Sequence, residues 1–69
     1  MKITYDKEAD AMYIEFSDRV FASNKKIDSD TIIDLDQEGN IIGIELLNAS
    51  KRIPKESFSE VNFKNLISV

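Results

Sequence analysis

Apolar and polar residues alternate with a period of two along several short stretches of this chain. In residues 11–17 (AMYIEFS), Met12, Ile14 and Phe16 would lie on one face of a strand and the intervening residues on the other. Residues 41–47 (IIGIELL) are instead apolar on both faces, which places them near the middle of a sheet or under a partner. Strands are therefore predicted over residues 2–5, 11–17, 30–36 and 41–47, with a short edge strand within 18–29.

Two polar segments are predicted to be hairpin turns. Residues 6–10 (DKEAD) connect the first two strands, and the Asp6 side chain can accept hydrogen bonds from backbone N–H groups just ahead of it. In residues 37–40, Gly39 and Asn40 are the residue types that best tolerate a positive φ angle. Both connections are short enough to join antiparallel neighbours.

The end of the chain changes in character after a polar connector over residues 48–53. Pro54 suits the first turn of a helix, so one or two helical turns are predicted within 54–60, followed by a last strand over 61–69. A single C-terminal helix is the alternative. The predicted fold is mainly β, or α+β at most: one domain over residues 1–69, an antiparallel β-meander of about five strands with a short helix and a C-terminal strand.

Length and composition limit the core and the chemistry. A 69-residue chain buries only about 60% of its unfolded surface, and its core supplies a net stability of about 3–5 kcal/mol. The chain has no cysteine and no histidine, which removes disulfides, the commonest metal ligands and the commonest general base. Self-association is the remaining way to enlarge the core, so we expect a homodimer. Because histidine and cysteine are absent, we expect a protein that is not an enzyme and carries no cofactor.

The charge narrows the possible partners. A net charge of −4, from 13 acidic and 9 basic residues, disfavours nucleic acid and favours a basic protein. No apolar run approaches the ~20 residues that span a membrane, and Met1 and Lys2 lead directly into a strand-like segment without a signal-peptide pattern. With no cysteine, a cytoplasmic location is expected.

Residues 34–45 (DLDQEGNIIGIE) come close to a calcium-loop pattern. Oxygen-bearing side chains fall at loop positions 1, 3, 5 and 12, with glycine at position 6: Asp34, Asp36, Glu38, Glu45 and Gly39. The preceding residues are β-branched, however, where a calcium loop requires a helix. A hairpin would also carry Glu45 down the return strand, away from the other oxygens. A structural hairpin is therefore predicted, and a metal or ligand site made of these four acidic residues is the alternative.

Carboxylates near the turns are the other candidates for chemistry: Asp6, Asp10, Asp34 and Glu45. Two of these carboxyl groups could act in general acid–base catalysis if their side chains lay close together and one had a raised pKa. Turn capping explains the aspartates without chemistry. Glu45 interrupts an apolar strand, so it should lie on a wet face or pair with a base such as Lys2 or Arg52.

Two blocks of the sequence resemble the small prokaryotic family called domain of unknown function 2283. The blocks are Y-D-x-x-A-D-x-x-Y-I and D-x-D-x-x-G-x-x-x-G-I-E-x-x-x-A-S, carried here by Tyr5, Asp6, Asp10, Tyr13, Asp34, Asp36, Gly39, Gly43, Glu45 and Ser50. The resemblance implies no established activity, no catalytic residue and no cofactor. Similar members are often proposed to be antitoxin-like partners, encoded beside small proteins similar to ribonuclease-type toxins of the RelE kind. The resemblance thus implies a small basic toxin as a partner and a structural role for the matched residues.

Overall fold

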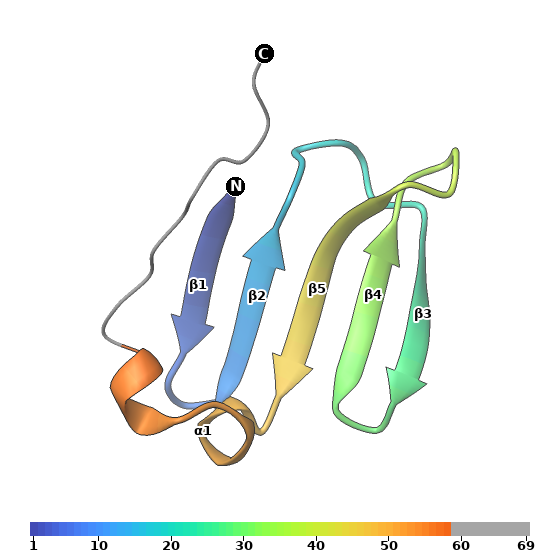
Figure 1. Cartoon of the computed structure of the whole chain (residues 1–69). Coiled ribbons are helices and arrows are strands. Elements are labelled where there is room, and N and C mark those ends of the chain that lie inside the picture. The colour runs from blue at the N-terminus through green and yellow to red at the C-terminus, as the bar shows by residue number, and fades with distance from the viewer. Residues whose placement is uncertain (59–69) are drawn as a thin grey trace, which may run out of the picture.

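A computed structural model describes residues 1–58 as a five-stranded antiparallel sheet with a short helical segment at one end (Figure 1). The strands, in chain order, are β1 (Lys2–Asp6), β2 (Ala11–Glu15), β3 (Ser23–Asp28), β4 (Thr31–Leu35) and β5 (Ile41–Leu47). All four strand pairings are antiparallel. The predicted mainly-β, antiparallel fold class is confirmed.

The order of the strands differs from that of a simple meander. Across the sheet the order is β1-β2-β5-β4-β3, so β5 lies between β2 and β4 (Figure 1). This agrees with the apolar pattern of β5 on both faces, which predicts a central strand. The lysine-bearing β3 is exposed along its whole length at one edge, as its composition predicts.

The strand register separates an apolar face from a polar one. Side chains of paired residues lie side by side, and successive residues alternate between faces. One row across β1, β2, β5 and β4 consists of Ile3, Ile14, Ile44 and Ile33. The apolar face, so defined, comprises Ile3, Tyr5, Met12, Ile14, Thr31, Ile33, Leu35, Ile42, Ile44 and Leu46. The polar face comprises Lys2, Thr4, Asp6, Ala11, Tyr13, Glu15, Ile32, Asp34, Gly43, Glu45 and Leu47.

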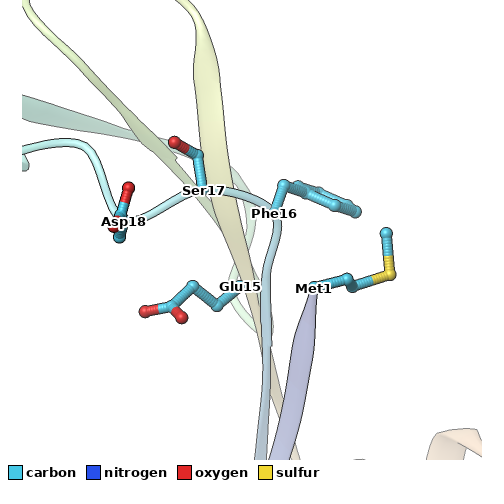
Figure 2. Close-up of a pocket in the computed structure, with 5 residues that line it drawn as sticks. All are labelled: Met1, Glu15, Phe16, Ser17 and Asp18. Atoms are coloured by element: carbon cyan, nitrogen blue, oxygen red, sulfur yellow. The ribbon is translucent and has the colours of Figure 1, made fainter.

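Figure 2 shows how the apolar face continues past the end of β2. The Phe16 side chain points to the same side as Met1, while the Glu15 side chain points the other way. Phe16 is 40% exposed, and it remains aligned with the sheet because its N–H donates to the Ile42 carbonyl oxygen at 2.9 Å. Phe16 therefore adds an aromatic ring to the exposed apolar surface.

A short helix, α1 (Ala49–Arg52), follows β5 where the sequence predicted a polar connector. That prediction was wrong because a four-residue helix is too short to show an apolar period, and its first residue is preceded by Asn48 at φ 52° with no side-chain cap. The single 3₁₀ turn, Lys55–Ser57, falls within the predicted helical range 54–60. The strand predicted over residues 61–69, and its helical alternative, lie outside the described residues.

Burial within residues 1–58 is shallow. The buried apolar side chains are those of Ile42 and Ala49, and no large side chain in this part of the chain is fully buried. Ile14, Ile33 and Ile44, at the centre of the apolar face, are each only half-buried. The sheet is thus a single layer, and within residues 1–58 its apolar face is covered mainly at the β1 edge, where the Phe58 ring lies 5.0 Å from that of Tyr5.

Candidate functional site

The turn between β4 and β5 is held by Asp36. Its Oδ1 atom accepts hydrogen bonds from the backbone N–H groups of Glu38 (2.9 Å) and Asn40 (2.8 Å), and Gly39 has a φ of 84°. Burial of Asp36 raises its pKa, but hydrogen bonds from the Asn40 backbone and from Arg19 outweigh this and lower it overall. The predicted hairpin with glycine at its tip is confirmed.

The structure does not bring the four residues of the calcium pattern together. Asp36 and Glu38 both face Arg19, whose Nη1 lies 3.0 and 3.7 Å from their carboxylate oxygens. Asp34 and Glu45 lie apart from that pair, on the polar face of β4 and β5. Among residues 1–58 no group of three or more acidic side chains is placed to hold a metal ion.

Asp10 joins the first hairpin to helix α1. Its carboxylate accepts hydrogen bonds from the Tyr5 hydroxyl (2.7 Å), the Ser50 N–H (3.0 Å) and the Ser50 hydroxyl (2.7 Å). The bond from the Ser50 hydroxyl is the largest cause of a lowered pKa at Asp10, and the bond from Tyr5 follows. Asp6 caps the same turn by accepting from the Glu8 and Ala9 N–H groups, as predicted. These family-pattern residues therefore have structural roles.

A second group of family-pattern residues meets on the polar face. Tyr13 on β2 is paired with Glu45 on β5, and Asp34 on β4 is paired with Gly43, two residues before Glu45. A Cβ atom at Gly43 would collide with the Tyr13 hydroxyl and ring, so the Tyr13 side chain lies across this glycine. The missing side chain at Gly43 thus allows Tyr13, Asp34 and Glu45 to form one cluster, here called the carboxyl cluster.

Electrostatics within the carboxyl cluster are unfavourable. Asp34 is only 7% exposed, and its Oδ1 atom has no hydrogen-bond partner in the described part of the chain. Desolvation raises the pKa of Glu45, and the charge of Asp34 and a hydrogen bond with it raise that pKa further. Desolvation and then the charge of Asp34 likewise raise the pKa of the Tyr13 hydroxyl.

Nothing in residues 1–58 neutralises this pair of carboxyl groups. Neither Asp34 nor Glu45 forms an ion pair with a lysine or arginine of that segment. The sequence offered Arg52 as a partner for Glu45, but Arg52 donates to the Asp30 carbonyl oxygen (2.6 Å) and the Thr31 hydroxyl (2.8 Å). Lys2, the other base that the sequence suggested as a partner for Glu45, is paired across the strands with Glu15 instead. The neighbour of Glu45 is another acid.

The carboxyl cluster has the properties of a functional site more than of a structural one. A buried polar atom without a partner costs about 1–3 kcal/mol. Within residues 1–58 the cluster caps no turn and forms no ion pair that would offset this cost. Such local conflicts are concentrated at functional sites. Chemically, a carboxyl group of raised pKa beside a second carboxylate can hold and release a proton, or accept hydrogen bonds from a cation.

The raised pKa of Glu45 predicts a pH-dependent gain in stability for Glu45→Gln. A folded-state pKa above the ordinary value of 4.5 contributes stability that is present below about pH 4.5 and lost as pH rises through the folded value. Glutamine does not ionise, so the variant should be more stable than the wild type at about pH 7.5 and no more stable at about pH 4.5. Urea unfolding at the two pH values measures this difference.

Glu8→Gln is the matched control, because Glu8 is an exposed glutamate in the β1–β2 turn, outside the strands β2, β4 and β5 that carry the cluster. It should show no such pH-dependent gain. A Glu45→Gln variant that is less stable than the wild type at about pH 7.5 would contradict the assigned environment of Glu45.

The fold and its two faces define a class of protein: a small antiparallel sheet with one apolar face and a carboxyl cluster on the other. Residues 2–50 match the family described as "Protein of unknown function (DUF2283)", so the chain belongs to this family. This confirms the resemblance identified in the sequence. All residues of the carboxyl cluster lie within the matched range.

One relative is an uncharacterised protein of the archaeon Methanocaldococcus jannaschii. It is 40% identical over 68 residues, which cover 97% of this chain and 55% of the relative. The chain therefore spans little more than half of that relative's length. No solved structure matches the chain. In the described part of the chain, no helix is long and apolar enough to cross a membrane.

Proposed function

We propose that the protein is a non-enzymatic protein-interaction module. Its apolar face packs against a second copy of the chain, and its polar face binds a basic protein, as an antitoxin binds its toxin. The observation that carries this proposal is the apolar face, because a sheet with one apolar face needs a second layer to form a core. Half-burial of Ile14, Ile33 and Ile44 supports the need for such a layer.

The distribution of charge favours a second copy as that layer. On β1, β2, β4 and β5 the apolar face carries no aspartate or glutamate, whereas the polar face carries Asp6, Glu15, Asp34 and Glu45. Two copies, each with a net charge of −4, repel each other least when their carboxylates point outward. Two sheets stacked face to face at about 10 Å would then share one core.

Two phenylalanines provide a matched test of the proposed dimer. Phe16 extends the apolar face, whereas Phe21 lies in the loop before β3 and is 53% exposed. Phe16→Asp should give a monomer of 7.9 kDa by light scattering, and Phe21→Asp should keep twice that mass. Circular dichroism verifies that both variants remain folded. A monomeric wild type, or equal masses for the two variants, would refute the dimer.

Support for a basic partner comes from the net charge and from the carboxyl cluster, which forms no ion pair with a lysine or arginine of residues 1–58. Complementary charge speeds encounter and selects the partner. Because the chain has no cysteine, we place this interaction in the cytoplasm. The test is co-expression with a basic protein encoded next to the gene. The partner should co-purify, and any toxicity it causes should be relieved; a partner that neither binds nor is neutralised would reject the antitoxin-like role.

A further inference from the structure

We propose that Asp34, Glu45 and Tyr13 form a receptor for a guanidinium group, supplied by an arginine of the basic partner. This inference rests on the proposed function in so far as a partner polypeptide supplies the arginine. The site itself is argued from residues of this chain alone. It lies on three adjacent strands, β4, β5 and β2, at the middle of the polar face.

The Asp34 carboxylate has a buried oxygen atom to which no described residue donates a hydrogen bond. More than nine-tenths of Asp34 is buried, yet its Oδ1 atom accepts no hydrogen bond within residues 1–58. Almost all buried polar atoms in folded proteins have a partner, so an exception requires an explanation. A donor from outside the chain explains it. The half-buried Tyr13 side chain, which lies over Gly43 beside Asp34, would have to move to admit that donor.

Residues 1–58 supply no cation to the cluster. Arg19 is already engaged by Asp36 and Glu38 at the β4–β5 turn. Arg52 is engaged by the Asp30 carbonyl oxygen and the Thr31 hydroxyl. The two carboxyl groups of the cluster therefore share their negative charge with no described base, and a positive ligand would relieve that repulsion.

The chemistry of the cluster favours guanidinium over a metal ion. No group of three or more acidic side chains in residues 1–58 is placed to hold a metal ion, whereas hard cations take six or more oxygen ligands. A planar guanidinium donates to two carboxylates at once and stacks on aromatic rings, and Tyr13 supplies such a ring. An ammonium group offers neither the plane nor the fork of donors.

Binding should be linked to proton release. A guanidinium group requires both carboxyl groups to be ionised, while in the free protein Glu45 retains its proton to a higher pH than an ordinary glutamate. The affinity should therefore rise with pH until Glu45 is fully ionised. This linkage distinguishes a specific site from general attraction to an acidic surface, which depends much less on one proton.

The experiment is a titration of ¹⁵N-labelled full-length protein with N-acetyl-arginine amide, followed by amide shifts. The N-acetyl-lysine amide, the neutral citrulline analogue and MgCl₂ are titrated in parallel. The arginine compound should shift residues of β2, β4 and β5 near the cluster, more strongly at about pH 8 than at about pH 5. Glu45→Gln and Asp34→Asn should each weaken binding at least about tenfold, and Glu8→Gln, in the β1–β2 turn, should leave it unchanged.

The proposal is overturned if the arginine compound produces no saturable shift, if citrulline or Mg²⁺ reproduces its effect, or if Glu45→Gln binds as the wild type does. Lysine binding as tightly as arginine would overturn the choice of guanidinium. Failure of the dimer is recognised separately, because the Phe16→Asp monomer should still bind the arginine compound. Failure of the receptor would in turn leave the mass of the wild type unchanged.

Discussion

Ile42→Ala is expected to remove about 2–5 kcal/mol of folding free energy, enough to unfold much of the protein. Ile42 is 4% exposed, on the central strand β5. In a domain of this size the core supplies a net stability of only about 3–5 kcal/mol. A large-to-small change at its centre can therefore remove most of that stability. Thermal unfolding followed by circular dichroism measures the loss.

Ile41→Ala is the matched control, since Ile41 precedes Ile42 on the same strand and is 50% exposed. It should change the unfolding free energy by about 0.5 kcal/mol or less. If the two alanine variants were equally stable, Ile42 would not lie at the centre of the core. That result would place the interior of the protein elsewhere.

Asp10→Ala is expected to produce the largest loss of stability among the polar substitutions. It removes the acceptor of three hydrogen bonds, from the Tyr5 hydroxyl and from the N–H and hydroxyl of Ser50. It also places alanine at a φ of 51°, which asparagine and aspartate tolerate better. Asp10→Asn keeps an acceptor and suits that φ angle, so its melting temperature should fall several degrees less than that of Asp10→Ala.

Glu8→Ala serves as the control for Asp10, because it alters the same turn and keeps the Glu8 backbone N–H that donates to Asp6. Its melting temperature should match that of the wild type. The lowered pKa of Asp10 adds a pH dependence, since the contribution of this carboxylate is present above its ordinary value of 3.8 and lost as pH falls through the lower folded value. An Asp10→Ala variant as stable as Glu8→Ala would show that α1 is not held by Asp10.

Local pattern was enough to predict the strands and the turns. Alternation identified β2, apolar residues on both faces placed β5 centrally, and Gly39 marked the β4–β5 turn, where it has a φ of 84°. The strand order was not accessible in the same way. Whether β5 pairs with β2 depends on the path of the loop between β2 and β3, which has no periodic signal. Helix α1 has only four residues, about one turn, which is too few to show a repeating apolar pattern.

The candidate site was harder to predict because it depends on register. The sequence named Asp34 and Glu45 among four candidate carboxylates, but it explained Asp34 by turn capping and gave Glu45 a base as its partner. Capping is done by Asp36 instead, and a register shift between Asp34 and Leu35 pairs Asp34 with Gly43. A single-residue slip in this pairing would place Asp34 on the other face. The glycine at position 43, inside an apolar strand, was the available signal of a close approach.

An isotope-filtered NOE measurement on a mixture of labelled and unlabelled full-length chains tests the proposed dimer directly. We expect intermolecular contacts among methyl groups of Ile14, Ile33 and Ile44 of one protomer and the same residues of its partner, because these side chains occupy the centre of the apolar face. Intermolecular contacts confined to polar-face residues, or none at a protein concentration of about 1 mM, would contradict the claim that two copies pack through their apolar faces.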